Sequence, residues 1–332
     1  MTGKRPPGRG RQSRWRNEKL LELEDILNDR NEDLTLVVGN GVNLSNKDAG
    51  NETWRGILEQ IGREHGFLDP EQELRETHSL VELSDLMQLH ADDADEADDD
   101  DGSKESVQSE FCNRLENWTH GRSHEFITSW ARKHDVPVLT TNFDETLSKA
   151  CGAELVHAKR DTSGARFSRY YPWSSRFEVR DQPIHRPRNS FAIWHVNGML
   201  KYVDSVRLGL THYMGSVQQA RTWMHRGDDR LFADERAIDR WKGQNTWLDA
   251  FFANDLLIFG LGLGRDEVFL RWLLIERARY IQRFGIQNCV GWYVRVEGES
   301  DPDRDFLLEH VGVQIVDVAR HDVIYSPDVW NA

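Results

Sequence analysis

The sequence predicts an α/β fold with a mostly parallel sheet, helices on both faces of that sheet, and helical insertions. Three apolar runs support this prediction, because each ends abruptly at glycines or small polar residues; they lie at 34–38, 137–139 and 255–259. Such runs are typical of strands that are buried on both faces. The carboxyl ends of parallel strands meet at one edge of a sheet, where ligands bind in open α/β folds. We therefore expect residues far apart in the sequence to share one site.

Two amphipathic helices are expected on either side of the first strand, at residues 18–28 and 53–67, because their apolar residues recur at near-helical spacing. Residues from about 68 to 135 are mostly helical in character and would form an insertion between the first two strands. This insertion contains an acidic loop at 92–106, in which eight of the ten residues from 92 to 101 are carboxylates. An acidic run without fixed geometry is typical of a solvated loop and not of a metal site.

The first strand runs directly into a glycine-punctuated turn formed by Gly39, Asn40 and Gly41. Glycines let backbone N–H groups approach a phosphate closely, and Asn40 and Asn43 are suited to bonding a ribose or a pyrophosphate. The turn matches neither the GxGxxG pattern nor a P-loop. Taken alone, this segment is interpreted equally well as a plain tight turn.

The second strand ends at small polar residues and a carboxylate. Thr141, Asn142, Phe143 and Asp144 fall at its carboxyl end, which makes them candidates for contact with a ligand. The alternative is a turn that caps the following helix through its Thr, Asn or Asp side chains.

Two later segments bring further candidates to the same edge. The third apolar run continues into Gly260 and Gly262, and Asp266 follows just before a strongly periodic helix. Residues 189–213 contain a β-rich run that carries His195. We therefore expect an imidazole near the shared edge of the sheet.

The last third of the chain completes the predicted sheet. Residues 214–247 are polar and helical in character, whereas 289–296 and 313–318 are β-rich runs. The tryptophans of the helical segments are expected to pack in the core and not to stack on a substrate.

Taken in order, these segments resemble the sirtuin-like family, specifically its bacterial branch of NAD-consuming proteins associated with defence against phage. The matching pieces are VVGNGVNLS, LTTNFDETL, IWHVNG, SVRLGLTHY and IFGLGLGRD, which together span about residues 34–274. Each piece is degenerate by itself, and the resemblance depends on their order and spacing.

The resemblance implies a Rossmann-like NAD-binding domain over residues 18–332 that hydrolyses NAD to ADP-ribose and nicotinamide, as the NAD-depleting effector of an antiphage defence system. It implies that Asn142 and His195 carry the chemistry, and that Asp144 contacts the carboxamide, fixes its loop or caps the next helix. The candidates for binding the dinucleotide are Gly39, Asn40, Gly41, Asn43, Thr141, Phe143, Gly260, Gly262 and Asp266. NAD is the substrate and no metal is required. The resemblance also implies a homo-oligomer and a partner protein such as a motor ATPase.

Two departures from the family pattern keep alternatives open. Sirtuin deacylases carry a zinc ribbon of two Cys-x-x-Cys pairs, but Cys112, Cys151 and Cys289 are isolated, so an NAD-dependent protein deacylase is less favoured. The family's histidine commonly stands directly before a glycine, and here that residue is Asn197. Either His195 acts from the same face of the strand, or the protein is an inactive relative that binds NAD or ADP-ribose.

The composition limits the class of protein. Hydrophobic residues at 38% and charged residues at 30% indicate a soluble protein, and the longest apolar runs are too short to cross a bilayer. Isolated cysteines fit a reducing cytoplasm. The net charge of −14 argues against nucleic-acid binding by the folded body, since phosphate contacts need clustered lysine and arginine.

Basic residues gather at the N-terminus. Residues 1–17 carry six of them among proline and glycine, which predicts a disordered basic tail. A solubilising role is favoured for this tail. Contact with an acidic partner or with nucleic acid is the alternative, and no other segment of the chain is a candidate for nucleic-acid contact.

Overall fold

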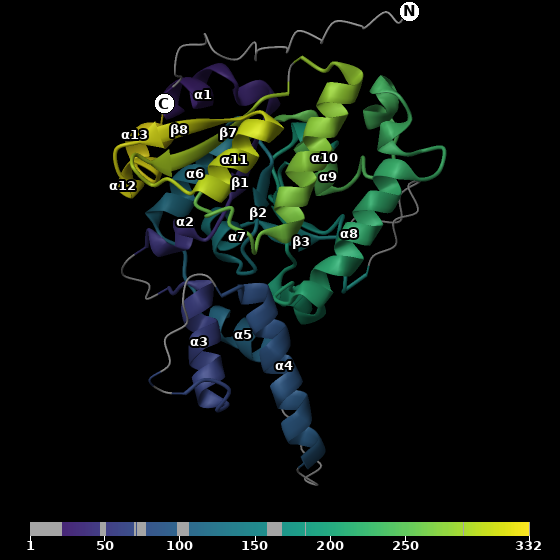
Figure 1. The fold of residues 1–332 in the computed structure, drawn as a ribbon. Helices are drawn as coiled ribbons and strands as arrows, with labels where there is room; N and C mark the ends of the chain where they lie inside the picture. The colour runs from purple at the N-terminus through teal and green to yellow at the C-terminus, as the bar shows by residue number, and fades with distance from the viewer. Residues whose placement is uncertain are drawn as a thin grey trace, which may run out of the picture.

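The computed structural model describes residues 22–46, 51–69, 71, 78–97, 106–157, 168–182, 184–287 and 289–331, with only the backbone described at 93–97 (Figure 1). The predicted basic tail at 1–17 and residues 98–105 of the predicted acidic loop lie outside the described residues.

Within the described residues, eight strands form one mixed sheet in the order β3-β4-β5-β2-β1-β6-β7-β8. The strands are β1 (Leu34–Val38), β2 (Val138–Thr140), β3 (Glu154–Val156), β4 (Arg176–Glu178), β5 (Ile193–His195), β6 (Asp255–Phe259), β7 (Gly291–Val296) and β8 (Val313–Val318). In this order, all neighbouring strands from β5 to β8 are parallel, which includes β2, β1, β6 and β7 between them. The pairs β3–β4 and β4–β5 at the other end of the sheet are antiparallel. The predicted α/β fold with a mostly parallel sheet is therefore confirmed.

The register places three of the sequence-predicted strands side by side at the centre. Leu36 of β1 pairs with Val138 of β2 on one side and with Leu257 of β6 on the other. All residues of β1, β2 and β6 are buried, as expected for strands covered on both faces. Their carboxyl ends consequently meet at one edge of the sheet.

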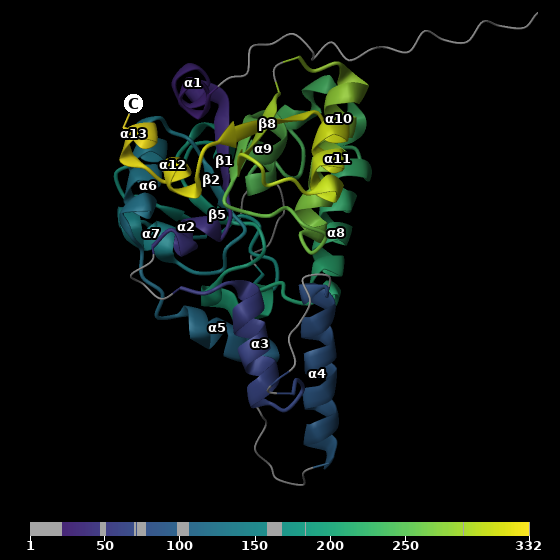
Figure 2. The same ribbon diagram turned by 60° about the vertical axis from the view of Figure 1, so that its left-hand side comes forward.

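Helices cover both faces of the sheet (Figure 2). On one face, Val37, Leu139 and Trp194 pack with α8 (Leu210–His225), α9 (Trp247–Ala253), α10 (Val268–Phe284) and α11 (Pro302–Val311). On the other face, alternate strand residues pack with α1 (Leu23–Asp29), α6 (Arg122–Lys133), α7 (Thr146–Cys151), α12 (His321–Ile324) and α13 (Pro327–Trp330). This two-sided packing follows from the alternation of side chains along each strand.

Three helices stand apart from the sheet, namely the helix that was predicted at 53–67 and two helices of the predicted insertion at 68–135. Helices α3 (Trp54–Glu64), α4 (Leu80–Ala97) and α5 (Val107–Leu115) pack in a core of their own, beyond the carboxyl edge of the sheet in both views (Figures 1 and 2). The insertion was expected to extend to residue 135, but α6 packs against the sheet. The acidic run was expected to be a loop from residue 92, whereas α4 continues through Ala97.

The short elements differ more from expectation. Of the predicted β-rich run at 189–213, only β5 is a strand, and the segment continues through a 3-10 turn (Leu200–Ser205) into α8. The remaining short elements are α2 (Gly41–Leu44) and the 3-10 turns Asn31–Asp33, Pro187–Asn189, Leu231–Ala233 and Glu235–Asp239. No helix in the described ranges is both long enough and apolar enough to cross a membrane.

Candidate functional site

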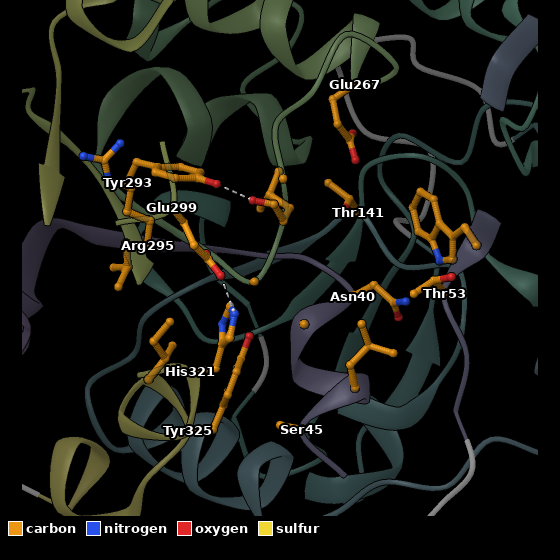
Figure 3. A pocket seen from close by; sticks show the side chains of 18 of the residues that line it. Asn40, Ser45, Thr53, Thr141, Glu267, Tyr293, Arg295, Glu299, His321 and Tyr325 are labelled. Atoms are coloured by element: carbon orange, nitrogen blue, oxygen red, sulfur yellow. Dashed lines mark hydrogen bonds and ion pairs between the residues drawn. The ribbon is translucent and has the colours of Figure 1, made fainter. Parts of the chain in front are cut away.

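A cavity of about 940 Å³ opens at the carboxyl edge of the sheet. Its walls come from the loops after β1, β2, β6 and β7, from the start of α3, and from α12. Figure 3 shows Asn40, Thr141 and Glu267 on one side of the cavity and Glu299 and His321 on the other. The volume lies within the range of about 300–1,000 Å³ that is typical of small-molecule and cofactor sites.

The two glycine loops at this edge are hydrogen-bonded to each other. The Gly39 N–H donates to the Phe259 carbonyl over 3.0 Å, and the Gly41 N–H donates to the Gly260 carbonyl over 2.7 Å. A Cβ atom at Gly39 would lie 2.3 Å from the Cβ of Leu261, and Gly260 has a φ of +71°. Close packing of the loops on each other therefore requires glycine at these positions. Gly41 and Gly260 line the cavity, whereas Gly39 does not.

The loop after β6 offers unused backbone donors to the cavity. Leu261 and Gly262 line it, and their N–H groups have no hydrogen-bond acceptor within the described part of the chain. Leu263 has a φ of +48° and is fully buried, which is an uncommon conformation for a residue with a side chain. Consecutive backbone N–H groups in such a loop are suited to binding an anion.

A buried polar network ties the first glycine loop to the end of β2. The Asn43 amide nitrogen donates to Asn40 Oδ1 (2.9 Å) and to Asp144 Oδ2 (2.8 Å). Asn43 Oδ1 in turn accepts from His124 Nε2 and from Thr146 Oγ1. Asp144 Oδ1 accepts the Thr146 N–H over 3.0 Å, at the start of α7. Of these residues only Asn40 lines the cavity, so Asn43 and Asp144 hold the loops in place and do not contact the cavity.

We expect His124 to make the protein labile to acid. Its Nδ1 accepts the Gly121 N–H, so Nε2 carries the proton, and burial lowers the pKa of the ring to about 4. The unfolded chain binds a proton near pH 6.5 and the native ring does not, so roughly 3 kcal/mol of stability should be lost as pH falls from 6.5 to 4. Urea unfolding across this pH range measures the loss. His124→Gln should flatten the dependence, and equal slopes in the two proteins would contradict the assignment.

Asn142 and His195 lie together at the ends of β2 and β5. Thr140 and His195 are paired in the sheet, and His195 Nδ1 donates to the Asn142 carbonyl over 2.7 Å. Because that carbonyl can only accept, Nδ1 carries the proton of the neutral ring and Nε2 has a free lone pair. Burial lowers the pKa of His195, which keeps the ring neutral near pH 7. In this tautomer Nε2 is available as a hydrogen-bond acceptor.

Both side chains retain an unused polar atom. Asn142 donates from Nδ2 to the Gly39 carbonyl (3.3 Å), but neither its Oδ1 nor His195 Nε2 has a partner among the described residues. Each residue is at most 5% exposed. Neither lines the cavity, which is bordered instead by Thr141, the residue next to Asn142 in the chain. Asn197 is also fully buried, and its Oδ1 and Nδ2 likewise have no partner in the described ranges.

Two other predicted binding residues lie outside the cavity wall. Phe143 is fully buried in the core of the insertion, where its ring stacks on Trp54 with the centroids 4.7 Å apart. Asp266 accepts hydrogen bonds from Ser79 Oγ (2.7 Å) and from the Leu80 N–H (3.1 Å), at the start of α4. Phe143 and Asp266 therefore connect the insertion to the edge of the sheet.

Several residues of the cavity were not predicted from the sequence. The far side is formed by Tyr293, Glu299 and His321, where the Tyr293 hydroxyl donates to the Leu261 carbonyl (2.6 Å) and His321 pairs with Glu299 at 2.9 Å (Figure 3). These residues lie in or follow the β-rich runs at 289–296 and 313–318, so reading the residues that follow those runs would have found part of this wall. Trp54 and Glu267 carried no comparable signal.

No metal centre is apparent in the described ranges, since no three His, Cys, Asp or Glu side chains there are placed to hold an ion together. Cys112, Cys151 and Cys289 form no disulfide within the described ranges.

A comparison with known protein families finds none that matches this chain. A comparison with curated protein sequences likewise finds no match.

Proposed function

We propose that the protein hydrolyses NAD to ADP-ribose and nicotinamide, as its resemblance to the sirtuin-like family implies. The observation that carries the proposal is the pair formed by Asn142 and His195. Both present an unpartnered buried acceptor atom at the carboxyl ends of adjacent parallel strands, beside a cavity bounded by two glycine loops. Buried polar atoms are rarely left unpaired, and the exceptions gather at functional sites.

The cavity is large enough for a dinucleotide, and its lining suggests where the diphosphate would bind. Leu261 and Gly262 line the cavity and their N–H groups have no acceptor among the described residues, so they are candidate donors to a pyrophosphate. Arg295 and Arg320 also line the cavity, but they are paired with Asp317 and Asp322 respectively. Backbone donors and not unpaired arginines therefore support the proposed diphosphate position.

In the proposed reaction, the bond between the ribose C1′ and the nicotinamide nitrogen breaks and its electron pair stays with nicotinamide. The ribose becomes oxocarbenium-like, and a water molecule adds to C1′. His195 Nε2 accepts the proton of that water and later releases it to solvent, while Asn142 Oδ1 accepts a hydrogen bond that orients the water. A neutral histidine is suited to this role near pH 7.

Replacing Asn142 with alanine tests the proposal. We expect Asn142→Ala to lower the rate of nicotinamide release by at least roughly tenfold, about 1.4 kcal/mol of barrier, with the fold retained. Chromatography of nicotinamide released by the purified full chain measures the rate. Asn28→Ala, an exposed asparagine near the end of α1, serves as the matched control. Unchanged turnover in a normally folded Asn142→Ala protein would remove Asn142 from the mechanism.

A second candidate is a protein that binds NAD or ADP-ribose without turnover. It is favoured by one observation, namely that His195 does not itself border the cavity. Saturable NAD binding by the purified chain, without release of nicotinamide, would distinguish this function from hydrolysis. The antiphage setting, a homo-oligomer and a motor-ATPase partner belong to the same proposal and depend on the resemblance alone.

A further inference from the structure

Glu267 places a carboxyl group on the cavity wall, and one of its two oxygens has no hydrogen-bond partner among the described residues. It occupies the N-cap position of α10, but its side chain makes no capping hydrogen bond there. Its carboxyl group points into the cavity on the side where Thr141 lies (Figure 3). The Oε2 atom is buried and has no hydrogen-bond partner in the described part of the chain. A carboxyl group that makes no helix cap and leaves one buried oxygen unpaired costs stability, which points to a role in binding.

Asn197 lies beside this carboxyl group, close enough to lower its pKa, although no hydrogen bond of normal geometry joins the two. Both polar atoms of the Asn197 side chain are unpaired as well. A carboxylate supplies acceptors, and an amide supplies donors and an acceptor. Hydroxyl groups, which both donate and accept, match this combination, whereas a phosphate would be repelled by the carboxylate.

We propose that Glu267 and Asn197 bind the hydroxyl groups of the ribose that carries nicotinamide, and that Glu267 makes the site prefer ADP-ribose to ADP. This inference rests on the proposed function, since it assigns one part of the NAD site. The assignment to this ribose, and not to the adenosine ribose, follows from position. Glu267 stands on the same side of the cavity as Thr141, next to Asn142, whereas Glu299 and His321 stand on the opposite side.

The charge state of Glu267 supports this role. Burial, together with the charge of Asp266 beside it, raises its pKa to about 7. Tyr213 of α8 also faces this carboxyl group and stays un-ionised, because burial raises its own pKa. At pH 8 Glu267 is therefore mostly ionised, and hydrogen bonds to an ionised carboxylate are stronger than those to a neutral group.

Calorimetric titration of the full chain with ADP-ribose and with ADP at pH 8 tests the inference. ADP lacks the terminal ribose of ADP-ribose and ends instead in a phosphate that carries about one more negative charge. We expect the wild type to bind ADP-ribose at least roughly tenfold more tightly than ADP, from one charge-assisted hydrogen bond or more. Glu267→Gln should lose most of this preference while its affinity for ADP stays nearly unchanged. The matched control Glu299→Gln, a cavity carboxyl on the opposite side, should alter both affinities alike and keep their ratio.

Each outcome decides one question. A Glu267→Gln protein that keeps the preference for ADP-ribose, or that loses affinity for both probes equally, would overturn the role of Glu267. A wild type that binds neither probe would overturn the proposed dinucleotide site itself. Asn197→Ala gives a second measurement, because it should reduce the preference for ADP-ribose without removing it.

Discussion

His195→Ala is expected to abolish most NAD hydrolysis, with kcat lowered at least roughly a hundredfold, because positioned acid–base groups commonly contribute that much. Affinity for NAD should remain close to that of the wild type, since His195 is not among the residues that line the cavity. Nicotinamide release measures turnover, and titration with NAD measures binding. In the wild type, the lowered pKa of His195 should place the acid limb of the kcat profile below the usual histidine range near 6.5.

The control for this experiment is His185→Ala, an exposed histidine in the same region of the chain. It should leave turnover unchanged. If His195→Ala lost NAD binding together with turnover, the ring would be part of the binding site and not the base. If neither changed, the chemistry would lie elsewhere, and Asn197→His would be the next variant to measure.

Phe143→Ala should have the largest effect on stability. The ring is fully buried, stacks on Trp54 and meets the Phe111 ring edge-on at 5.9 Å between centroids. Truncating a buried phenylalanine to alanine costs about 3–5 kcal/mol, through lost burial and the cavity left behind. Urea unfolding measures the change, and circular dichroism checks that helix content is retained.

Two further variants serve as comparisons for this result. Phe143→Leu should cost less than the alanine variant because more of the volume is kept, and Phe306→Ala should stay within about 0.5 kcal/mol because Phe306 is 65% exposed. A loss below about 1 kcal/mol for Phe143→Ala would mean that the insertion tolerates the cavity, contrary to the packing described above.

The central strands could be predicted because strands that are buried on both faces appear in the sequence as apolar runs. Residues 34–38 and 255–259 are almost wholly apolar, and each pairs with a neighbour in the observed sheet. Strands β3 and β4 do not appear as apolar runs. Each has three residues and carries exposed or charged side chains such as Glu154 and Arg176, and β3 forms the edge of the sheet with β4 next to it. Their pairing depends on tertiary contacts that no local pattern encodes.

The candidate site was predictable only in part, for a reason that lies in the loops. Asn40 and Thr141 follow strands directly, and both border the cavity as expected from their place at the sheet edge. Asn43 and Asp144 have the same kinds of side chain but turn inward to bond each other. The direction of a side chain in a loop is set by the fold around it. Glu267 was missed because an acidic residue at a helix start is ordinary in sequence.

The hydrogen bonds between the two glycine loops bear on the thermodynamics and rate of ligand capture. The Gly39 and Gly41 N–H groups are bonded to Phe259 and Gly260 within the protein itself. Loops fixed in this way need not be ordered by a ligand, so association avoids part of the conformational entropy that mobile loops lose. Such rigid loops should favour fast association in a single kinetic phase. Differences in affinity between ligands should then lie mainly in their dissociation rate constants.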